Sequence, residues 1–273
     1  MEKGYLFSSA DHLHTLNGKP LTGTSSVMDV VAKPLTWWAS GEAVKTLGWT
    51  PKTEYVNGKP RTLPKEPRIE AASTRWDELL EFVAHNPDGE GVAWLETLDI
   101  AYGAHANSLK KSAGKGKDLH SELEKYVKYC IEKNEGAPAN VKSEDIQNFI
   151  DWACDNVEQF LWSEMHTFSE EHWLGGITDA GAKMSDGKIA LIDFKSSKAA
   201  YASQFLQIAG YSLQIKEKGG YTSKGEKTME PLEVDEFIVI PFGAPKFTVE
   251  YVKETKRHQE GFLAALNLYR LLN

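Results

Sequence analysis

Residues 175–197 constrain the fold of this chain most, because they read as two strands of which the second is too apolar to lie on a surface. Ile189 to Phe194 is apolar on both faces, which is typical of a strand in the middle of a covered sheet. Yet this strand ends with Asp193 and Lys195 on one face. Burying such charges costs several kcal/mol each unless they are compensated, and a divalent metal is the simplest compensation. The alternative is an ordinary exposed hairpin with charges at one end.

The Asp-Gly pair between the two strands predicts a hairpin, and the length of its loop decides which residues face each other. A two-residue loop places Asp179 opposite Phe194, with the aspartates on opposite sides of the sheet. A three-residue loop over 185–187, with its glycine left-handed, places Asp179 opposite Asp193 with Cβ atoms about 5 Å apart. Two carboxylates that close repel unless a cation lies between them. We favour the three-residue loop.

The composition is that of a globular chain with one large domain or one and a half: 273 residues, 41% hydrophobic and 26% charged. A net charge of −8 argues against a general polyanion-coating protein but is compatible with a local basic groove around an acidic metal site. The two cysteines lack metal spacing, so neither a disulfide framework nor an iron–sulfur cluster is expected. No stretch has the character of a signal peptide or a membrane span, which predicts a cytoplasmic protein.

A glycine-containing basic loop is expected before the central strands. It holds four lysines in eight residues: Lys110, Lys111, Lys115 and Lys117. The loop is either a solvated connection or a phosphate-binding element, and the lysine density in an acidic chain favours the second. Asp118 is then expected to cap a helix with His120 in its first turn. His120 is either a packing residue or a metal ligand.

Two further polar features flank the hairpin. Glu164 lies on an expected strand over 161–168, either as a metal ligand or neighbouring base, or as an exposed carboxylate. The helix expected over 201–215 carries Gln204, Gln207 and Tyr211 on one face, at i, i+3 and i+7. That face is either the solvated side of the helix or a surface above the site that contacts a phosphate backbone.

The order of these features resembles the PD-(D/E)xK nuclease superfamily, and more narrowly its RecB-type exonuclease branch. That branch includes phage exonucleases and the mitochondrial genome-maintenance exonuclease. The matching motifs are His120, Glu164, Gly176-x-x-Asp179, Asp193-x-Lys195-Ser-Ser and Gln207-x-x-x-Tyr211. The segments 24–27 and 37–39 resemble the opening of phage members more loosely. Relatives with an iron–sulfur cluster use four cysteines, which this chain lacks.

The resemblance implies an α+β fold: a central mixed sheet flanked by helices, as in restriction endonucleases. It implies a core over 111–273, with 1–110 as a helical and loop region packed on it. It also implies one or two Mg²⁺ or Mn²⁺ ions and hydrolysis of DNA phosphodiesters, with Ser196 and Ser197 among the DNA-binding residues.

The site roles that the resemblance implies are specific. Asp179, Asp193, His120 and the carbonyl of Phe194 would hold the metal. Lys195 would orient or help deprotonate the attacking water. The remaining polar residues would act as a further carboxylate or brace the site and the DNA backbone: Glu164, Gln207 and Tyr211.

Several points stay open. The implied role is an exonuclease in phage-type DNA recombination, repair or replication, in the host cytoplasm if a phage encodes it. The implied partners are DNA and a single-strand annealing or replication protein, without a membrane. An endonuclease using the same site, a catalytically silent DNA-binding scaffold and a metal-dependent hydrolase of another substrate are the alternatives. Polarity, strandedness and oligomeric state do not follow from the sequence.

Overall fold

The computed structural model describes residues 4–31, 39–43, 53–56, 59–62, 92–133 and 144–273, and the side chains of 53–99 and 108–118 are outside this description. Contacts divide the chain into two units, 1–32 with 115–273 and 33–114. The division expected from the sequence grouped residues 1–110 together, whereas residues up to 32 group with the core. The Trp37-Trp38 pair lies outside the described residues.

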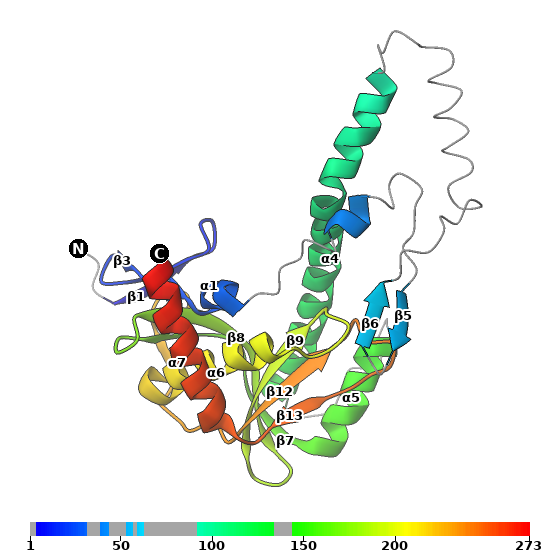
Figure 1. Cartoon of the computed structure of the whole chain (residues 1–273). Coiled ribbons are helices and arrows are strands. Elements are labelled where there is room, and N and C mark those ends of the chain that lie inside the picture. Colours follow the sequence, from blue (N-terminus) through cyan, green and yellow to red (C-terminus); the bar gives the residue numbers. More distant parts are fainter. Residues whose placement is uncertain (1–3, 32–38, 44–52, 57–58, 63–91, 134–143) are drawn as a thin grey trace. The chain divides into compact units, whose positions relative to one another are not determined.

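The core is a mixed sheet of eight strands within the described residues, in the order β11-β10-β7-β8-β9-β12-β13 with β4 paired to β8 (Figure 1). The long strands are β7 (Val157–Ser169), β8 (Leu174–Met184), β9 (Ile189–Lys195) and β12 (Glu236–Pro241). The shorter strands are β4 (Thr22–Gly23), β10 (Gly220–Tyr221), β11 (Lys227–Met229) and β13 (Glu250–Val252). Strands β7, β8 and β9 are antiparallel neighbours, while β9 and β12 run parallel. The expected α+β class is confirmed.

The β8–β9 hairpin has the three-residue loop. The Met184 amide donates to the Lys188 carbonyl at 2.8 Å, and Gly187 has φ +87°, a left-handed conformation that glycine adopts without steric cost. The ladder then pairs Ala180 with Ile192. The predicted register is therefore confirmed. Strand β9 lies between β8 and β12 and is buried along most of its length, as its apolar composition indicates.

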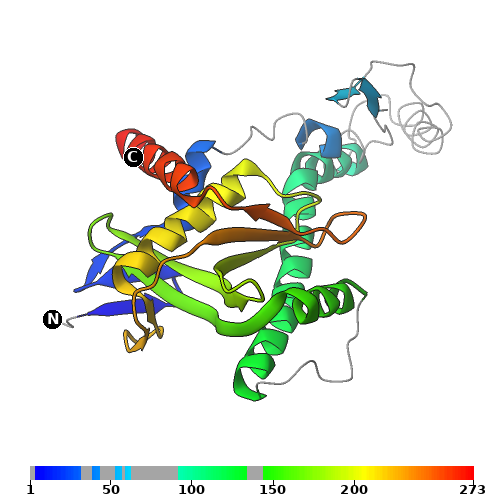
Figure 2. The ribbon, with the colours of Figure 1, turned by 90° about the horizontal axis from the view of Figure 1, so that it is seen from below.

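Helices cover both faces of the sheet (Figure 2). One face packs against α6 (Ala202–Lys218) and α7 (Thr255–Leu272). We call this layer the α6-side cluster; it includes Trp162, Met165, Leu191, Ile208, Tyr211, Phe237, Phe262 and Leu266. The other face packs against the last turns of α4 (Val92–Lys133) and against α5 (Glu144–Asn156). This α4-side cluster includes Leu123, Val127, Phe149, Phe160, Ala180, Ile192, Phe194 and Ile238.

The expected basic loop is wrong, because residues 110–117 lie within α4, a single helix of 42 residues. The expected cap at Asp118 is wrong for the same reason. Lysine and alanine are good helix formers, and two glycines cost only about 2 kcal/mol together relative to alanine. Helical segments on either side extend through such a stretch, since adding a residue to an existing helix is far easier than starting one.

The N-terminal strands form a small sheet of β1 (Tyr5–Ser8), β2 (Leu13–Leu16) and β3 (Lys19–Pro20). Asn17 and Gly18 both have positive φ, 53° and 75°, and form the turn between β2 and β3. The chain continues through β4 into α1 (Thr24–Val27) and a 3₁₀ turn, η1 (Met28–Val31). In the other unit, β5 (Thr53–Val56) and β6 (Lys59–Thr62) form a separate hairpin. No helix among the described residues combines the length and apolarity needed to cross a membrane.

His14 anchors the N-terminal sheet to the core. Its ring is 6% exposed, its Nδ1 lies 2.6 Å from the Tyr5 hydroxyl, and Gly175 leaves the space that the ring occupies. Burial, with the charges of His166 and His12, lowers the pKa of His14 to about 4. The imidazole is therefore neutral in the folded protein over most of the acid range.

The first prediction concerns acid stability. Between pH 6.5 and 4 the unfolded chain binds a proton at His14 that the folded chain excludes, so stability falls as the pH decreases through this window. The loss amounts to at most about 3 kcal/mol. We expect His14→Gln to flatten this slope in urea unfolding measured from pH 7.5 to 4.5. His258→Gln, outside this cluster, should keep the wild-type slope; an unchanged slope in His14→Gln would contradict the assignment.

Candidate active site

Three carboxylates lie in one row across adjacent strands. The paired residues on either side of Glu164 place it level with Asp179 on β8. The pair of Ala180 with Ile192 places Asp179 level with Asp193 on β9. The row Glu164–Asp179–Asp193 therefore crosses β7, β8 and β9 at one level, where the β8–β9 ladder ends. Sequence reasoning predicted the last two of these positions from the loop length alone.

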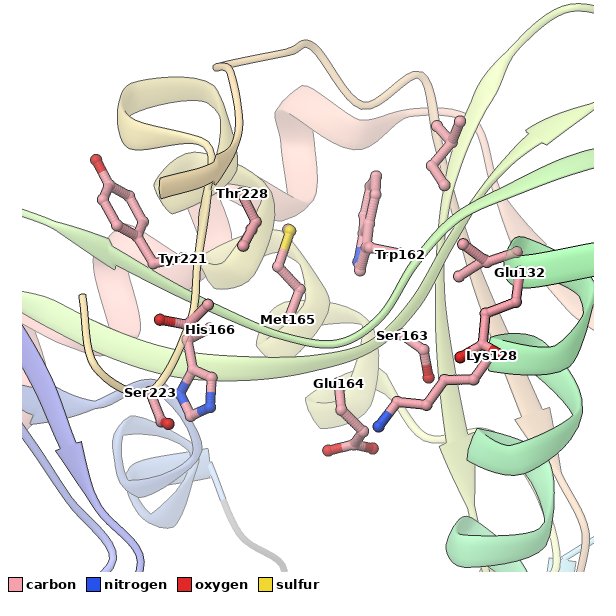
Figure 3. Close-up of a pocket in the computed structure, with 13 residues that line it drawn as sticks. Lys128, Glu132, Trp162, Ser163, Glu164, Met165, His166, Tyr221, Ser223 and Thr228 are labelled. Atoms are coloured by element: carbon pink, nitrogen blue, oxygen red, sulfur yellow. The ribbon is translucent and has the colours of Figure 1, made fainter. Parts of the chain in front are cut away.

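Glu164 has φ +48°, a left-handed conformation that is unusual for a residue within a strand. This conformation breaks the alternation of side chains, so that Trp162 and Met165, three residues apart, both join the α6-side cluster. The Thr178 hydroxyl accepts from the Trp162 indole at 3.0 Å and donates to the Met165 carbonyl at 3.2 Å, which holds the irregular backbone. Glu164 points to the other side of the strand, toward α4 (Figure 3). Backbone strain of this kind gathers at functional sites.

His120, Glu164 and Asp179 form a candidate metal site. Their ligand atoms all lie within 4.8 Å of one another, and all three side chains are half-buried. The Nδ1 of His120, on α4, is 3.8 Å from Oδ1 of Asp179. Carboxylate oxygens suit hard divalent cations, and one imidazole nitrogen favours Mn²⁺ over Mg²⁺ among them. The donor set could therefore hold a divalent cation.

Two residues that sequence reasoning did not single out belong to this environment. His120, Glu124 and Lys128 are spaced four residues apart on α4 and so share one helix face. Lys128 forms an ion pair with Glu124. Both residues affect the pKa of Glu164. Burial, Asp179 and Glu124 raise this pKa to about 7, and Lys128 opposes the shift. The spacing of His120, Glu124 and Lys128 at i, i+4 and i+8 was the sequence feature that indicated a shared helix face.

Asp193 is the most buried carboxylate of the row, at 4% exposure; burial raises its pKa, and the charge of Lys195 opposes this shift. The Lys195 ammonium donates to Oδ1 at 2.9 Å and lies 2.7 Å from Oδ2. Burial by itself lowers the pKa of Lys195, but the charges of Asp193 and Asp179 outweigh it and raise the pKa overall. Lys195 is thus held as an ammonium ion. Asp193 lies outside the group of three that surrounds the candidate metal position.

Gln207 and Tyr211 of α6 extend this network. Lys195 donates to Oε1 of Gln207 at 3.4 Å, and Nε2 of Gln207 donates to the Tyr211 hydroxyl at 2.8 Å. The Tyr211 ring lies over Gly176, where a Cβ atom would be only 2.4 Å from Cε1 of the ring. The Gly-x-x-Asp and Gln-x-x-x-Tyr motifs therefore pack against each other through Gly176 and Tyr211. Gln207 thus contacts Lys195 directly, and Tyr211 supports Gln207.

Phe194 contributes through its backbone amide, which donates to Oδ2 of Asp179 at 2.7 Å. This bond fixes the carboxylate just beyond the last paired residues of β8 and β9. The Phe194 ring packs in the α4-side cluster, 6.2 Å edge-to-face from the His120 ring. The backbone amide of Phe194, rather than its carbonyl, therefore contacts Asp179, which the sequence predicts to be a metal ligand.

The remaining predicted DNA-binding residues divide into two sets. Gln204 donates to the Ser197 hydroxyl at 3.1 Å and accepts the Tyr201 amide, so it fastens the loop after β9 to the start of α6. Ser196 is exposed in the same loop. The other set lies on α4 with side chains outside the described part of the chain: Lys110, Lys111, Lys115 and Lys117.

No family model matches the chain, and no curated protein matches it. Fold, site geometry and the order of the motifs are therefore the basis for assigning a function.

The second prediction concerns Glu164 in metal-free protein. Because its folded pKa is raised, the folded state holds a proton between about pH 4.5 and 7 that the unfolded chain releases, and stability falls as the pH increases through this window. Glu164→Gln should remove this loss. With allowance for solvent screening, the variant should gain about 1–2 kcal/mol over wild type at pH 8 and little at pH 4. Chemical denaturation in EDTA measures it, with Glu158→Gln as control; a gain independent of pH would contradict it.

The third prediction concerns the metal. Mn²⁺ should raise the thermal midpoint of the wild-type protein, since a ligand at 100 times its Kd stabilises the folded state by about 2.7 kcal/mol. Asp179→Asn removes a charged ligand and should abolish most of this gain. Asp155→Asn, an exposed position on α5, should behave as wild type. Equal Mn²⁺ stabilisation of all three proteins would place the ion elsewhere.

Proposed function

We propose that this protein is a Mg²⁺- or Mn²⁺-dependent deoxyribonuclease that acts as an exonuclease on DNA ends. The observation that carries this proposal is the row Glu164–Asp179–Asp193 with Lys195 beside it and His120 facing it. A cluster of carboxylates with one retained ammonium suits an anionic phosphodiester whose charge grows during hydrolysis. The motif order, which resembles RecB-type exonucleases, supports the same reaction.

Each residue of the site has a distinct role in this proposal. His120 and Asp179 would hold the cation, which would supply Lewis-acid stabilisation and lower the pKa of water. The Phe194 amide keeps the Asp179 carboxylate oriented toward it. Glu164 is either a ligand or the residue that accepts a proton, since a pKa of about 7 suits proton exchange near neutral pH.

Lys195 acts as a charged donor rather than as a base. Its raised pKa keeps the proton in place, and an ammonium ion donates hydrogen bonds to phosphate or water oxygens. Asp193 holds one side of this ammonium and Gln207 the other. Of the two roles predicted from the sequence, orientation of the water agrees better with this environment than its deprotonation.

The biological setting belongs to the same proposal. We place the protein in the cytoplasm, in the host cytoplasm if a phage encodes it, acting in DNA recombination, repair or replication. DNA is the proposed partner, together with a single-strand annealing or replication protein.

The fourth prediction is a cleavage test. End-labelled linear DNA and a covalently closed circle are incubated with Mg²⁺, Mn²⁺ or EDTA. We expect metal-dependent shortening of the linear DNA alone, and the label released first gives the direction. Lys195→Ala should lower the rate at least about 100-fold, because one preorganised charged donor is worth this much. Lys198→Ala, three residues further on and exposed, is the matched control.

Other outcomes identify the alternatives. Cutting of the circle would make the protein an endonuclease with the same site. DNA binding without cleavage under any metal would support a silent scaffold. Metal binding without either DNA binding or cleavage would support a hydrolase of another substrate. Lys195→Ala leaves the Asp193 carboxylate without its ammonium, so its folding must be checked by circular dichroism before its rate is interpreted.

A further inference from the structure

A pocket of about 460 Å³ lies directly beside the candidate active site and shares Glu164 with it (Figure 3). Three elements line it: the end of α4, the middle of β7, and the β10–β11 hairpin. Its size falls within the range of pockets that enclose one drug-sized molecule, and a nucleoside monophosphate is of that size.

The pocket exists because the sheet is incomplete here. Strand β10 pairs with β7 at a single position, Tyr221 opposite His166. From Val157 to Met165 the outer edge of β7 has no strand partner among the described residues. Unpaired backbone amides and carbonyls of an edge strand are free to bind another molecule. Residues of both faces of β7, such as Met165 and Glu164, therefore reach the same groove.

The lining combines hydrogen-bonding groups with an apolar wall. Ser163 lines the groove, and its hydroxyl is buried without a hydrogen-bond partner within the described part of the chain. Ser223 and Thr228 add exposed hydroxyls from the hairpin. Leu161 and the buried Met165 form the apolar part of the lining. This combination suits a nucleobase and its sugar better than a bare anion, since Glu132 and Glu164 also face the groove.

We propose that this groove binds one unpaired nucleotide of the DNA strand, with its phosphate at the Glu164 end. The inference rests on the proposed function, of which it names the substrate form: a single-stranded end. A paired base has its hydrogen-bonding edge occupied by its partner, so only an unpaired base presents that edge to the polar groups of a free strand edge. The groove also lies against the metal-site carboxylates, which brings the attached phosphate to them.

The test measures nucleotide binding without cleavage. Wild-type protein in Mn²⁺ is titrated with thymidine 5′-monophosphate, which has no phosphodiester bond to cleave, and, separately, with inorganic phosphate by calorimetry. Thr228→Trp places a large ring in the groove from the exposed side of the hairpin. We expect it to weaken nucleotide binding at least tenfold, while Lys224→Trp, in the same hairpin but outside the lining, binds as wild type.

Several results would overturn the inference. These are no nucleotide binding by the wild type, equal binding by Thr228→Trp, or phosphate binding as tight as that of the nucleotide. Thr228→Trp must keep the wild-type Mn²⁺-induced thermal shift, which shows that the fold and the metal site are intact. If it does not, Ser223→Trp, in the loop between β10 and β11, is used in its place.

The nuclease proposal fails independently. Suppose that the protein binds the nucleotide, that Thr228→Trp weakens this binding, and that no metal supports DNA cleavage. This result would support the pocket assignment and reject the nuclease. Cleavage of blunt duplex ends at the same rate as unpaired ends, unaffected by Thr228→Trp, would reject the pocket and keep the nuclease. Preference for unpaired ends, lost in Thr228→Trp, supports both.

Discussion

Electrostatic repulsion within one row of carboxylates is the constraint on which this structure depends. Adjacent strands hold opposite side chains about 5 Å apart, and three acidic residues at one level of three strands repel strongly in a half-buried environment. The chain offsets this repulsion in a different way at each position. Asp193 has the Lys195 ammonium, and Asp179 accepts the Phe194 amide. Burial raises the pKa of both Glu164 and Asp193, so these two carboxylates gain a proton more readily than exposed ones do.

The two helical layers serve this row from opposite sides. The α6 layer supplies Gln207 and Tyr211, which hold Lys195 beside Asp193, and Gly176 admits the Tyr211 ring. The α4 layer supplies His120 to the other side. Because both layers pack on strands with fully buried side chains, such as Leu191 and Ile192, the polar groups are held by a rigid core. The apolar character of β9 on both faces is thus a requirement of the site as well as of the fold.

What the sequence predicts and what it misses follow from the range of the interactions. The hairpin register was predictable because one left-handed glycine at 187 and a loop length decide it locally. The continuous helix through 110–117 was not, since the flanking helical segments outweigh the local preference of two glycines. The left-handed Glu164 was not predictable either, because Thr178 on the neighbouring strand stabilises that backbone. The pairing of Asp179 with Asp193 was therefore more predictable than the backbone geometry around Glu164.

Carboxylates with a nearby side-chain cation differ from those without one, and only the second kind is available to a ligand from solution. The Lys195 ammonium lies 2.7 Å from Oδ2 of Asp193, so this carboxylate has a cation of its own. Glu164 and Asp179 have no such cation among the described side chains, since the ammonium of Lys128 is paired with Glu124. A proton on Glu164 relieves the repulsion only below about pH 7. Above that pH the remaining negative charge, with the His120 nitrogen beside it, would be stabilised by a cation from solution, so that at the proposed metal site proton and metal would compete for one position.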